Sequence, residues 1–292
     1  MSLPEGAEPA FRAPPLACDA HFHVFGPLDK YPARDPGLRY PIPVAPLADY
    51  LKLAQRLGVE RFVFVQPSAY LRDNECQLDA MQEASARLGL PCLGIVDIED
   101  NAPDIEFARM DRIGVRGVRI NVSPIHPPDL GLAESMLPRI RRMEARCAEF
   151  GWHLDFLLPG WLTAELLPVL AKLKVDYSLA HMGMFPAKDG PQQPGFRKLL
   201  ELLKNGSGRC WVKLTGVYRI SQAPGFADVL PMARALIEAA PDRLIWGSDF
   251  PHLSFADRVG SVELYNLVGQ WAPDEATRKK IFSDNPKTLY GF

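Results

Sequence analysis

The chain of 292 residues lacks a surplus of charge of either sign, since 33 basic side chains are set against 35 acidic ones and leave a formal net charge of -2. Such a balance gives no electrostatic attraction to nucleic acid or to an anionic membrane surface. The sequence also lacks any run of 18 consecutive apolar residues, so it offers no candidate for a membrane-spanning helix. We therefore expect a small-molecule substrate, with no nucleic-acid partner and no membrane.

Motifs for redox chemistry and for nucleotide binding are also missing. The five cysteines are odd in number, are widely spaced and contain no C-x-x-C pair, which argues against a zinc ribbon or a dithiol site. We expect reduced thiols and a cytoplasmic protein, because the start of the chain has early glutamates and no apolar run of signal-peptide length. No G-x-G-x-x-G or G-x-x-x-x-G-K-[ST] motif follows the first predicted strand, which disfavours a nucleotide-binding fold.

What the chain does contain is a regular alternation of short apolar runs and amphipathic stretches. Several amphipathic stretches end in a glycine, including Gly58, Gly114 and Gly151, as is typical of helix C-termini. Eight strand-helix units predict an α/β fold, a (β/α)8 TIM barrel, over residues 16–292, with residues 1–15 as a flexible N-terminal arm. The predicted strands cover residues 17–24, 61–66, 92–98, 115–122, 152–158, 176–182, 210–216 and 243–249.

Two histidines end the first predicted strand, in the stretch CDAHFHV at residues 18–24. Side chains two residues apart on a strand point to the same side, so His21 and His23 share one face while Phe22 points to the other. In a barrel that face is the interior at the C-terminal mouth, where barrel enzymes keep their catalytic residues. A pair of hydrogen-bonded core histidines is the alternative explanation.

Further ionisable residues end the sixth and eighth predicted strands, in AHMG and GSDFPH. Closure of the barrel places strand 8 beside strand 1, which brings Asp249 close to His21 and His23. We therefore predict a catalytic cluster of His21, His23, His181 and Asp249, although Asp249 could instead cap a helix. His252 is expected either to hold Asp249 in place or to contact the substrate.

The fourth predicted strand ends in VRGVRIN, where Arg119 and Asn121 share one strand face. The planar guanidinium of Arg119 at the mouth would suit a substrate carboxylate, and Arg219, just after strand 7, is a second candidate. A surface ion pair is the alternative for both arginines. His153 lies at the start of strand 5, on the opposite side of the barrel, and is predicted to be structural. No role is assigned to His126.

In this order, the segments HFH, VRGVRIN, GWH, AHMG and WGSDFPH resemble the amidohydrolase superfamily, and in particular its branch of 2-pyrone-4,6-dicarboxylate and sugar lactonases. The likeness runs from about Cys18 to the closing DNPKTLYGF and implies a (β/α)8 barrel that hydrolyses a carboxylated lactone. It also implies that Asp249 is the general base and that Arg119 binds a substrate carboxylate. Residues expected at further substrate positions at the mouth are Arg219, Tyr40, Gln66, Asn121 and His252.

The chain departs from the pyrone lactonase pattern at three places. Met184 follows HMG where that branch has arginine, an arginine after strand 4 is replaced near Ile125, and Leu157 or Leu158 stands near a strand 5 tyrosine. Two charges that a dicarboxylate would need are therefore missing. A lactone with one carboxylate, or a sugar lactone, is expected as readily as the pyrone dicarboxylate.

Metal use stays open at this point. Binuclear amidohydrolases carry a lysine on strand 4 and a histidine on strand 5, whereas this chain has Arg119 or Asn121 and an apolar FLLPG, so two metals are not expected. The cofactor prediction is either none or one Zn²⁺, which would be held by the side chains of the predicted cluster with an open position for water. These side chains are His21, His23, His181 and Asp249.

The reaction also has alternatives. An aspartate of ordinary pKa is a weak base, which suffices for an activated lactone but not for an amide, so a lactonase is favoured over an amidase. A lactone isomerase and a Zn²⁺-dependent decarboxylase of the same superfamily remain rivals. A non-catalytic binding barrel would have no need for four ionisable groups at one mouth. No oligomeric state is predicted.

Overall fold

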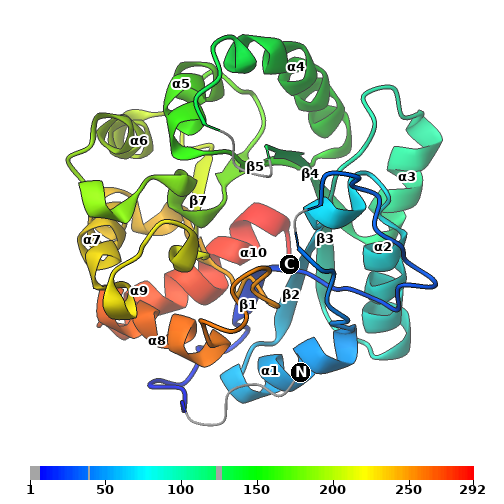
Figure 1. Ribbon diagram of the computed structural model, residues 1–292, viewed down its shortest axis with the longest axis horizontal. Coiled ribbons are helices and arrows are strands. Elements are labelled where there is room, and N and C mark those ends of the chain that lie inside the picture. Colours follow the sequence, from blue (N-terminus) through cyan, green and yellow to red (C-terminus); the bar gives the residue numbers. More distant parts are fainter. Residues whose placement is uncertain (1–6, 39, 123–126) are drawn as a thin grey trace.

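The computed structural model describes residues 7–38, 40–122 and 127–292. Its centre is one sheet of eight parallel strands in the order β1 to β8 (Figure 1). Each strand lies within its predicted range, which confirms the prediction of eight strands. The strands are β1 Cys18–Phe22, β2 Arg61–Val65, β3 Cys92–Val96, β4 Val115–Asn121, β5 His153–Leu157, β6 Tyr177–Leu179, β7 Cys210–Leu214 and β8 Leu244–Trp246.

The sheet closes between the segment after β8 and strand β1. The amide of Asp249 donates to the carbonyl of His21 at 2.8 Å, and the amide of His23 donates to the carbonyl of Phe250 at 2.8 Å. These bonds bring the two predicted ends of the sheet together, as the (β/α)8 TIM-barrel prediction requires. The prediction of fold class is confirmed.

Helices surround the strands in sequence order (Figure 1). In α1, Tyr50, Leu53 and Leu57 are buried at helical spacing, and the ring of Tyr50 stacks on Phe22 of β1 with 3.6 Å between the ring centroids. None of the helices in the described part of the chain is both long and apolar enough to cross a membrane. The helices are α1 Leu47–Leu57, α2 Glu75–Gln82, α3 Asp104–Ile113, α4 Leu132–Phe150, α5 Gly160–Leu170, α6 Pro194–Asn205, α7 Leu230–Ala239, α8 Ser261–Trp271, α9 Glu275–Lys279 and α10 Asn285–Tyr290.

The N-terminal end of the barrel, called the base here, is filled by apolar side chains. Tyr290 of α10 packs with the interior residues Cys18 and Trp211. His153 is buried beside them, with its Nδ1 2.7 Å from the carbonyl oxygen of Arg116 and its ring set edgewise to Tyr290. The contacts of His153 are therefore at the base and not at the mouth.

Part of the predicted N-terminal arm is packed rather than loose. The ring of Phe11 stacks on Tyr265 of α8 with 4.3 Å between centroids, and the amide of Ala10 donates to Asn266 Oδ1 at 2.7 Å. A ring stack and a hydrogen bond to a side chain thus hold Phe11 and Ala10 on α8. Residues 1–6 of the arm lie outside the described residues.

Candidate active site

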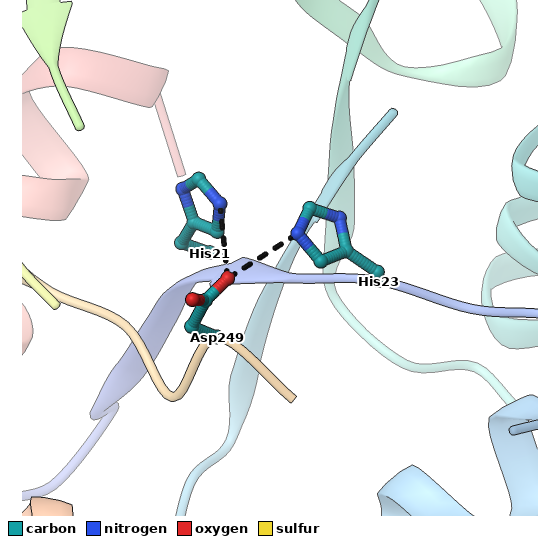
Figure 2. Close-up of side chains that lie close together, drawn as sticks. All are labelled: His21, His23 and Asp249. Atoms are coloured by element: carbon teal, nitrogen blue, oxygen red, sulfur yellow. Dashed lines mark ion pairs between the residues drawn. The ribbon is translucent and has the colours of Figure 1, made fainter. Parts of the chain in front are cut away.

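His21 of strand β1, His23 just after this strand and Asp249 after β8 converge, as Figure 2 shows. Nε2 of His21 lies 3.6 Å from Oδ1 of Asp249, and Nε2 of His23 lies 3.3 Å from the same oxygen. All three side chains are buried. Phe22 points away from them to Tyr50, so the alternation predicted from CDAHFHV is observed.

The backbone of Asp249 is in the left-handed region, with φ of 57°. Non-glycine residues adopt this conformation at a cost, and such residues cluster at functional sites. Oδ2 accepts hydrogen bonds from the Tyr218 hydroxyl at 2.5 Å and from Arg219 Nε at 3.1 Å. Oδ1 has no hydrogen-bond partner within the described part of the chain. One carboxylate oxygen is therefore fixed, and the other is available.

The charge state of Asp249 follows from its neighbours. Burial by itself would raise the pKa of this carboxyl group, but the Arg219 guanidinium and the nearby imidazoles outweigh burial and hold the pKa well below its usual range. Asp249 is therefore an ionised carboxylate at neutral pH.

His181 follows β6 and completes the histidine cluster. Its Nε2 is 3.9 Å from Oδ2 of Asp249, and its ring centroid is 5.1 Å from that of His21. Gly216, after β7, permits this placement, because a Cβ atom there would lie 2.3 Å from His181 Nδ1. The structure thus brings together the four predicted catalytic residues His21, His23, His181 and Asp249.

The histidines of the cluster are neutral. Burial lowers the pKa of His21 and of His23, and it lowers the pKa of His181 to about 3. A neutral imidazole has one ring nitrogen that donates and one that accepts a hydrogen bond or binds a metal. The position of each ring proton therefore decides what each histidine can do.

A pocket of about 60 Å³ opens over this cluster. The predicted substrate residues Tyr40, Arg119, Asn121 and Arg219 line it, while His21 lies beneath. The lining residues are His23, Tyr40, Pro67, Ser68, Arg119, Asn121, Leu157, His181, Arg219, Asp249, Leu253 and Ser254.

The two arginines are not surface ion pairs, because 3% of the Arg119 side chain and 23% of the Arg219 side chain are exposed. Arg119 donates from Nη1 to the carbonyl of Gln66 at 2.9 Å, and its Nε lies 3.9 Å from Asp155 Oδ2. The guanidinium of Arg219 contacts the rings of Tyr218 and Phe255. Both cations are thus held in place at the mouth.

Two of the predicted substrate residues are turned away from the pocket. The side-chain amide of Gln66 donates to the carbonyls of Leu71 and Asp73, so this side chain supports a loop. His252 has its Nε2 2.7 Å from Ser261 Oγ and its Nδ1 3.4 Å from the Tyr218 hydroxyl. The contacts of His252 place it behind Asp249. His126 and Ile125 lie outside the described residues.

The sequence reasoning missed three polar residues that support the site. Tyr218 holds Asp249, as described above. Lys213 of β7 and Asp155 of β5 form an ion pair of 2.7 Å inside the barrel, with both side chains fully buried. The sequence did contain a signal for this ion pair. The predicted strands CWVKLTG and WHLDFLL each carry one charged residue in the middle, and such a residue must be paired in a barrel interior.

The donor atoms of the cluster fit a single metal ion. One ligand atom each from His21, His23 and Asp249 lies within 4.8 Å of the others. Among the described residues, His21 Nε2 and Asp249 Oδ1 have no hydrogen-bond partner, so both are available to a ligand. Two imidazole nitrogens and a carboxylate oxygen suit Zn²⁺. His181, which was predicted as a further ligand, is not part of this group, and its Nε2 lies 3.9 Å from the other oxygen of Asp249.

Comparison with known proteins now places the chain in a family. The model of the amidohydrolase family matches residues 18–292. The chain belongs to the amidohydrolase family. Members of this family often use a divalent metal, which accords with the donor group described above.

Amidohydrolases that act on lactones are among the similar proteins. The chain is 36% identical to a 4-sulfomuconolactone hydrolase of Hydrogenophaga intermedia, over 96% of this chain and 90% of the relative. It is 29% identical to a D-galactarolactone isomerase of Agrobacterium fabrum, over 97% and 92%. A crystal structure of a proposed 2-pyrone-4,6-dicarboxylic acid hydrolase from Pseudomonas putida superposes with a TM-score of 0.81 at 31% identity, covering 94% of this chain and 97% of that one.

Proposed function

We propose that this amidohydrolase opens a carboxylated lactone by hydrolysis, with Asp249 as the general base. The observation that carries the proposal is the available Oδ1 of an ionised, buried Asp249 in a pocket that is also lined by Arg119 and Arg219. The similarity to a sulfomuconolactone hydrolase and to a proposed pyrone dicarboxylate hydrolase supports the same reaction class.

The reaction has a simple balance of bonds and protons. Oδ1 of Asp249 takes a proton from a water molecule, whose oxygen forms a bond to the lactone carbonyl carbon. His181, a neutral imidazole that lines the pocket and has one donating ring nitrogen, stabilises the negative charge that develops on the carbonyl oxygen. The bond to the ring oxygen then breaks, Asp249 returns the proton to that oxygen, and the product is a hydroxy acid.

The charges around the pocket favour a substrate with one anionic group there. Arg219 is paired with Asp249, and Lys213 is paired with Asp155. Arg119 makes no hydrogen bond to a carboxylate among the described residues, since its Nε lies 3.9 Å from Asp155 Oδ2 and has no hydrogen-bond partner there. We assign Arg119 to a carboxylate of the substrate, with Tyr40 and Asn121 as its polar neighbours in the pocket.

If a metal is bound, His21, His23 and Asp249 would hold it. A divalent cation there would polarise the lactone carbonyl and lower the pKa of a bound water. The roles of Arg119 and of the pocket residues in binding and orienting the lactone are the same with or without the cation.

Isomerisation of a lactone is the second candidate, because a D-galactarolactone isomerase is similar over 97% of the chain. In that reaction Asp249 would move a proton between two positions of the substrate, and no water would be added. The two reactions differ in a directly measurable product, since only hydrolysis creates a new carboxylic acid.

The test is a pH-stat assay, which measures acid release, on muconolactones, sugar-acid lactones, the pyrone dicarboxylate and a neutral lactone. Each substrate is tested after chelation and after addition of Zn²⁺. We expect acid release from at least one carboxylated lactone and none in the Asp249→Asn variant. Ring change seen by NMR without acid release would identify an isomerase, and no turnover of any lactone would overturn the proposal.

A further inference from the structure

A lysine inside the barrel is not accounted for by the proposed reaction. The side chain of Lys213 on β7 is fully buried, and its Nζ lies 2.7 Å from Asp155 Oδ1 and 3.4 Å from His21 Nδ1. A buried ammonium group is costly unless it is paired and hydrogen-bonded. An apolar side chain at this position would fill the same space without that cost. The presence of a lysine in contact with His21 therefore needs an explanation other than packing.

Burial lowers the pKa of Lys213, and the ion pair with Asp155 opposes this shift and favours the charged form. Besides Lys213, this carboxylate accepts a hydrogen bond from Ser178 Oγ at 2.6 Å and lies 3.9 Å from Arg119 Nε. Two cations and a hydroxyl donor therefore stabilise the ionised carboxylate, which in turn stabilises the ammonium.

The position of the ring proton of His21 follows from this contact. An ammonium group only donates hydrogen bonds, so the His21 Nδ1 that faces Lys213 is the accepting nitrogen. The ring proton must then be on Nε2, the atom that faces Oδ1 of Asp249 at 3.6 Å. The side chain of His21 thus presents an N–H group to the available oxygen of the general base.

His23 has the opposite arrangement. Its Nδ1 lies 2.7 Å from the carbonyl oxygen of Val65, and a carbonyl only accepts, so the ring proton of His23 is on Nδ1. Nε2 of His23 therefore presents a lone pair towards Asp249 Oδ1. Both histidines face the same oxygen of Asp249 (Figure 2). The inferred tautomers place an N–H group of His21 and a lone pair of His23 towards this oxygen.

We propose that Lys213 is a positioning residue, which acts through His21 by fixing the proton of that imidazole on Nε2, beneath Asp249. The N–H group then stabilises the ionised Oδ1 of the general base from below. A metal ion at the donor group described above would need a lone pair on the same nitrogen, so the ring proton of His21 would first have to move to Nδ1, and Lys213 opposes that shift. The assigned position of the His21 ring proton does not depend on the proposed function. The expected effect of Lys213 on turnover does rest on the proposed function.

The first test is ¹⁵N NMR of histidine-labelled protein, with the His21 signals assigned through a His21→Asn variant. We expect a proton on Nε2 of His21 and on Nδ1 of His23. A proton on Nδ1 of His21 in the unmodified protein would overturn the proposal, and this outcome does not depend on any variant that must fold.

Two double variants isolate the role of the lysine as a hydrogen-bond donor. Both carry Asp155→Asn, so that no unpaired charge is left in the barrel, and they differ only in Lys213→Met or Lys213→Gln. The glutamine retains a donor near His21 and the methionine does not. We expect the methionine variant to lose the fixed Nε2 proton of His21 and the glutamine variant to keep it; the same tautomer in both would overturn the proposal.

The same pair is then compared in turnover and in Zn²⁺ binding. We expect kcat in the methionine variant to be about tenfold lower than in the glutamine variant, and its Kd for Zn²⁺ by calorimetry to be about tenfold lower. Equal values in the two variants would contradict the proposed role of Lys213. If no lactone is opened by the unmodified protein but the histidine tautomers are as expected, the proposed function fails and the assignment of Lys213 stands.

Discussion

The two ends of the barrel differ in which residues adopt the left-handed backbone conformation. At the base, helices α1, α3 and α4 end in Gly58, Gly114 and Gly151, each with positive φ, so the turn carries no side-chain strain. At the mouth, most of the described non-glycine residues with positive φ lie in the segments after β6 and β8, which include His181 and Asp249. Six of the nine described non-glycine residues with positive φ thus lie close to the catalytic cluster, although Leu16, which precedes β1 at the base, also has positive φ.

Buried histidines occur at both ends, but their surroundings differ. His153 at the base has a backbone carbonyl and an aromatic ring as its closest partners. His21, His23 and His181 at the mouth surround a carboxylate that is also paired with an arginine. A buried histidine is therefore not diagnostic of a site, whereas a cluster of histidines around an available carboxylate oxygen is. We expect changes at the mouth to alter activity and changes at the base to alter stability.

The sharpest test of the mouth is Asp249→Asn. The amide cannot take a proton from water, so we expect kcat for the best lactone to fall by about a hundredfold to ten-thousandfold. The variant keeps an oxygen that can accept from Tyr218, and its urea midpoint should stay close to that of the unmodified protein. Near-normal turnover would remove Asp249 from the role of general base.

The next largest effect is expected for Arg119→Met. Loss of a buried partner for the substrate carboxylate should raise KM about a hundredfold for acidic lactones, which corresponds to about 3 kcal/mol. A neutral lactone of the same ring size is the control, and its KM should stay nearly unchanged. An equal rise in both KM values would mean that Arg119 shapes the pocket without binding the carboxylate.

At the base, His153 should affect stability through pH. Burial lowers its pKa from 6.5 to about 4, so on acidification the unfolded chain takes up the proton first and the folded state loses stability between these values. For this one group the loss from pH 7 to pH 5 is about 2 kcal/mol. We expect urea denaturation of His153→Asn to show a pH dependence smaller by that amount, with kcat at pH 7 unchanged; an equal pH dependence would show that His153 is not buried in its neutral form.

The smallest predicted effect is that of Gly151→Ala. Among the described residues, no atom outside its two chain neighbours lies within 4 Å of the added Cβ, so the substitution tests only the left-handed backbone, with φ of 67°. We expect a loss of about 1 kcal/mol in the free energy of unfolding, measured in urea, and no change in kcat. A loss of activity at this distance from the mouth would break the division between the two ends of the barrel.

Much of the fold and the centre of the site follow from simple periodicities. Alternation along β1 placed His21 and His23 on one face, and barrel closure brought Asp249 to them. The supporting residues Lys213 and Asp155 were missed, because alternation shows which face a residue occupies but not which partner it meets across the barrel.

The residues in loops could not be placed in the same way. His252 lies in the loop after β8 and has positive φ, so the direction of its side chain does not follow from strand or helix periodicity. Gln66 lies just after β2, and its side-chain amide donates hydrogen bonds to the carbonyls of Leu71 and Asp73. In both cases local hydrogen bonds, which depend on the folded loop, decide the orientation.

The hydrogen bonds that close the barrel have a further consequence for the dynamics of the protein. The backbones of His21, His23 and Asp249 form the seam between β1 and the segment after β8, so these residues cannot move apart unless the barrel itself opens. Amide hydrogen exchange at Asp249 and His23 should then be as slow as in the central strands. The seam depends only on backbone atoms. Side chains at the mouth can therefore change during evolution while the relative positions of these three residues are kept.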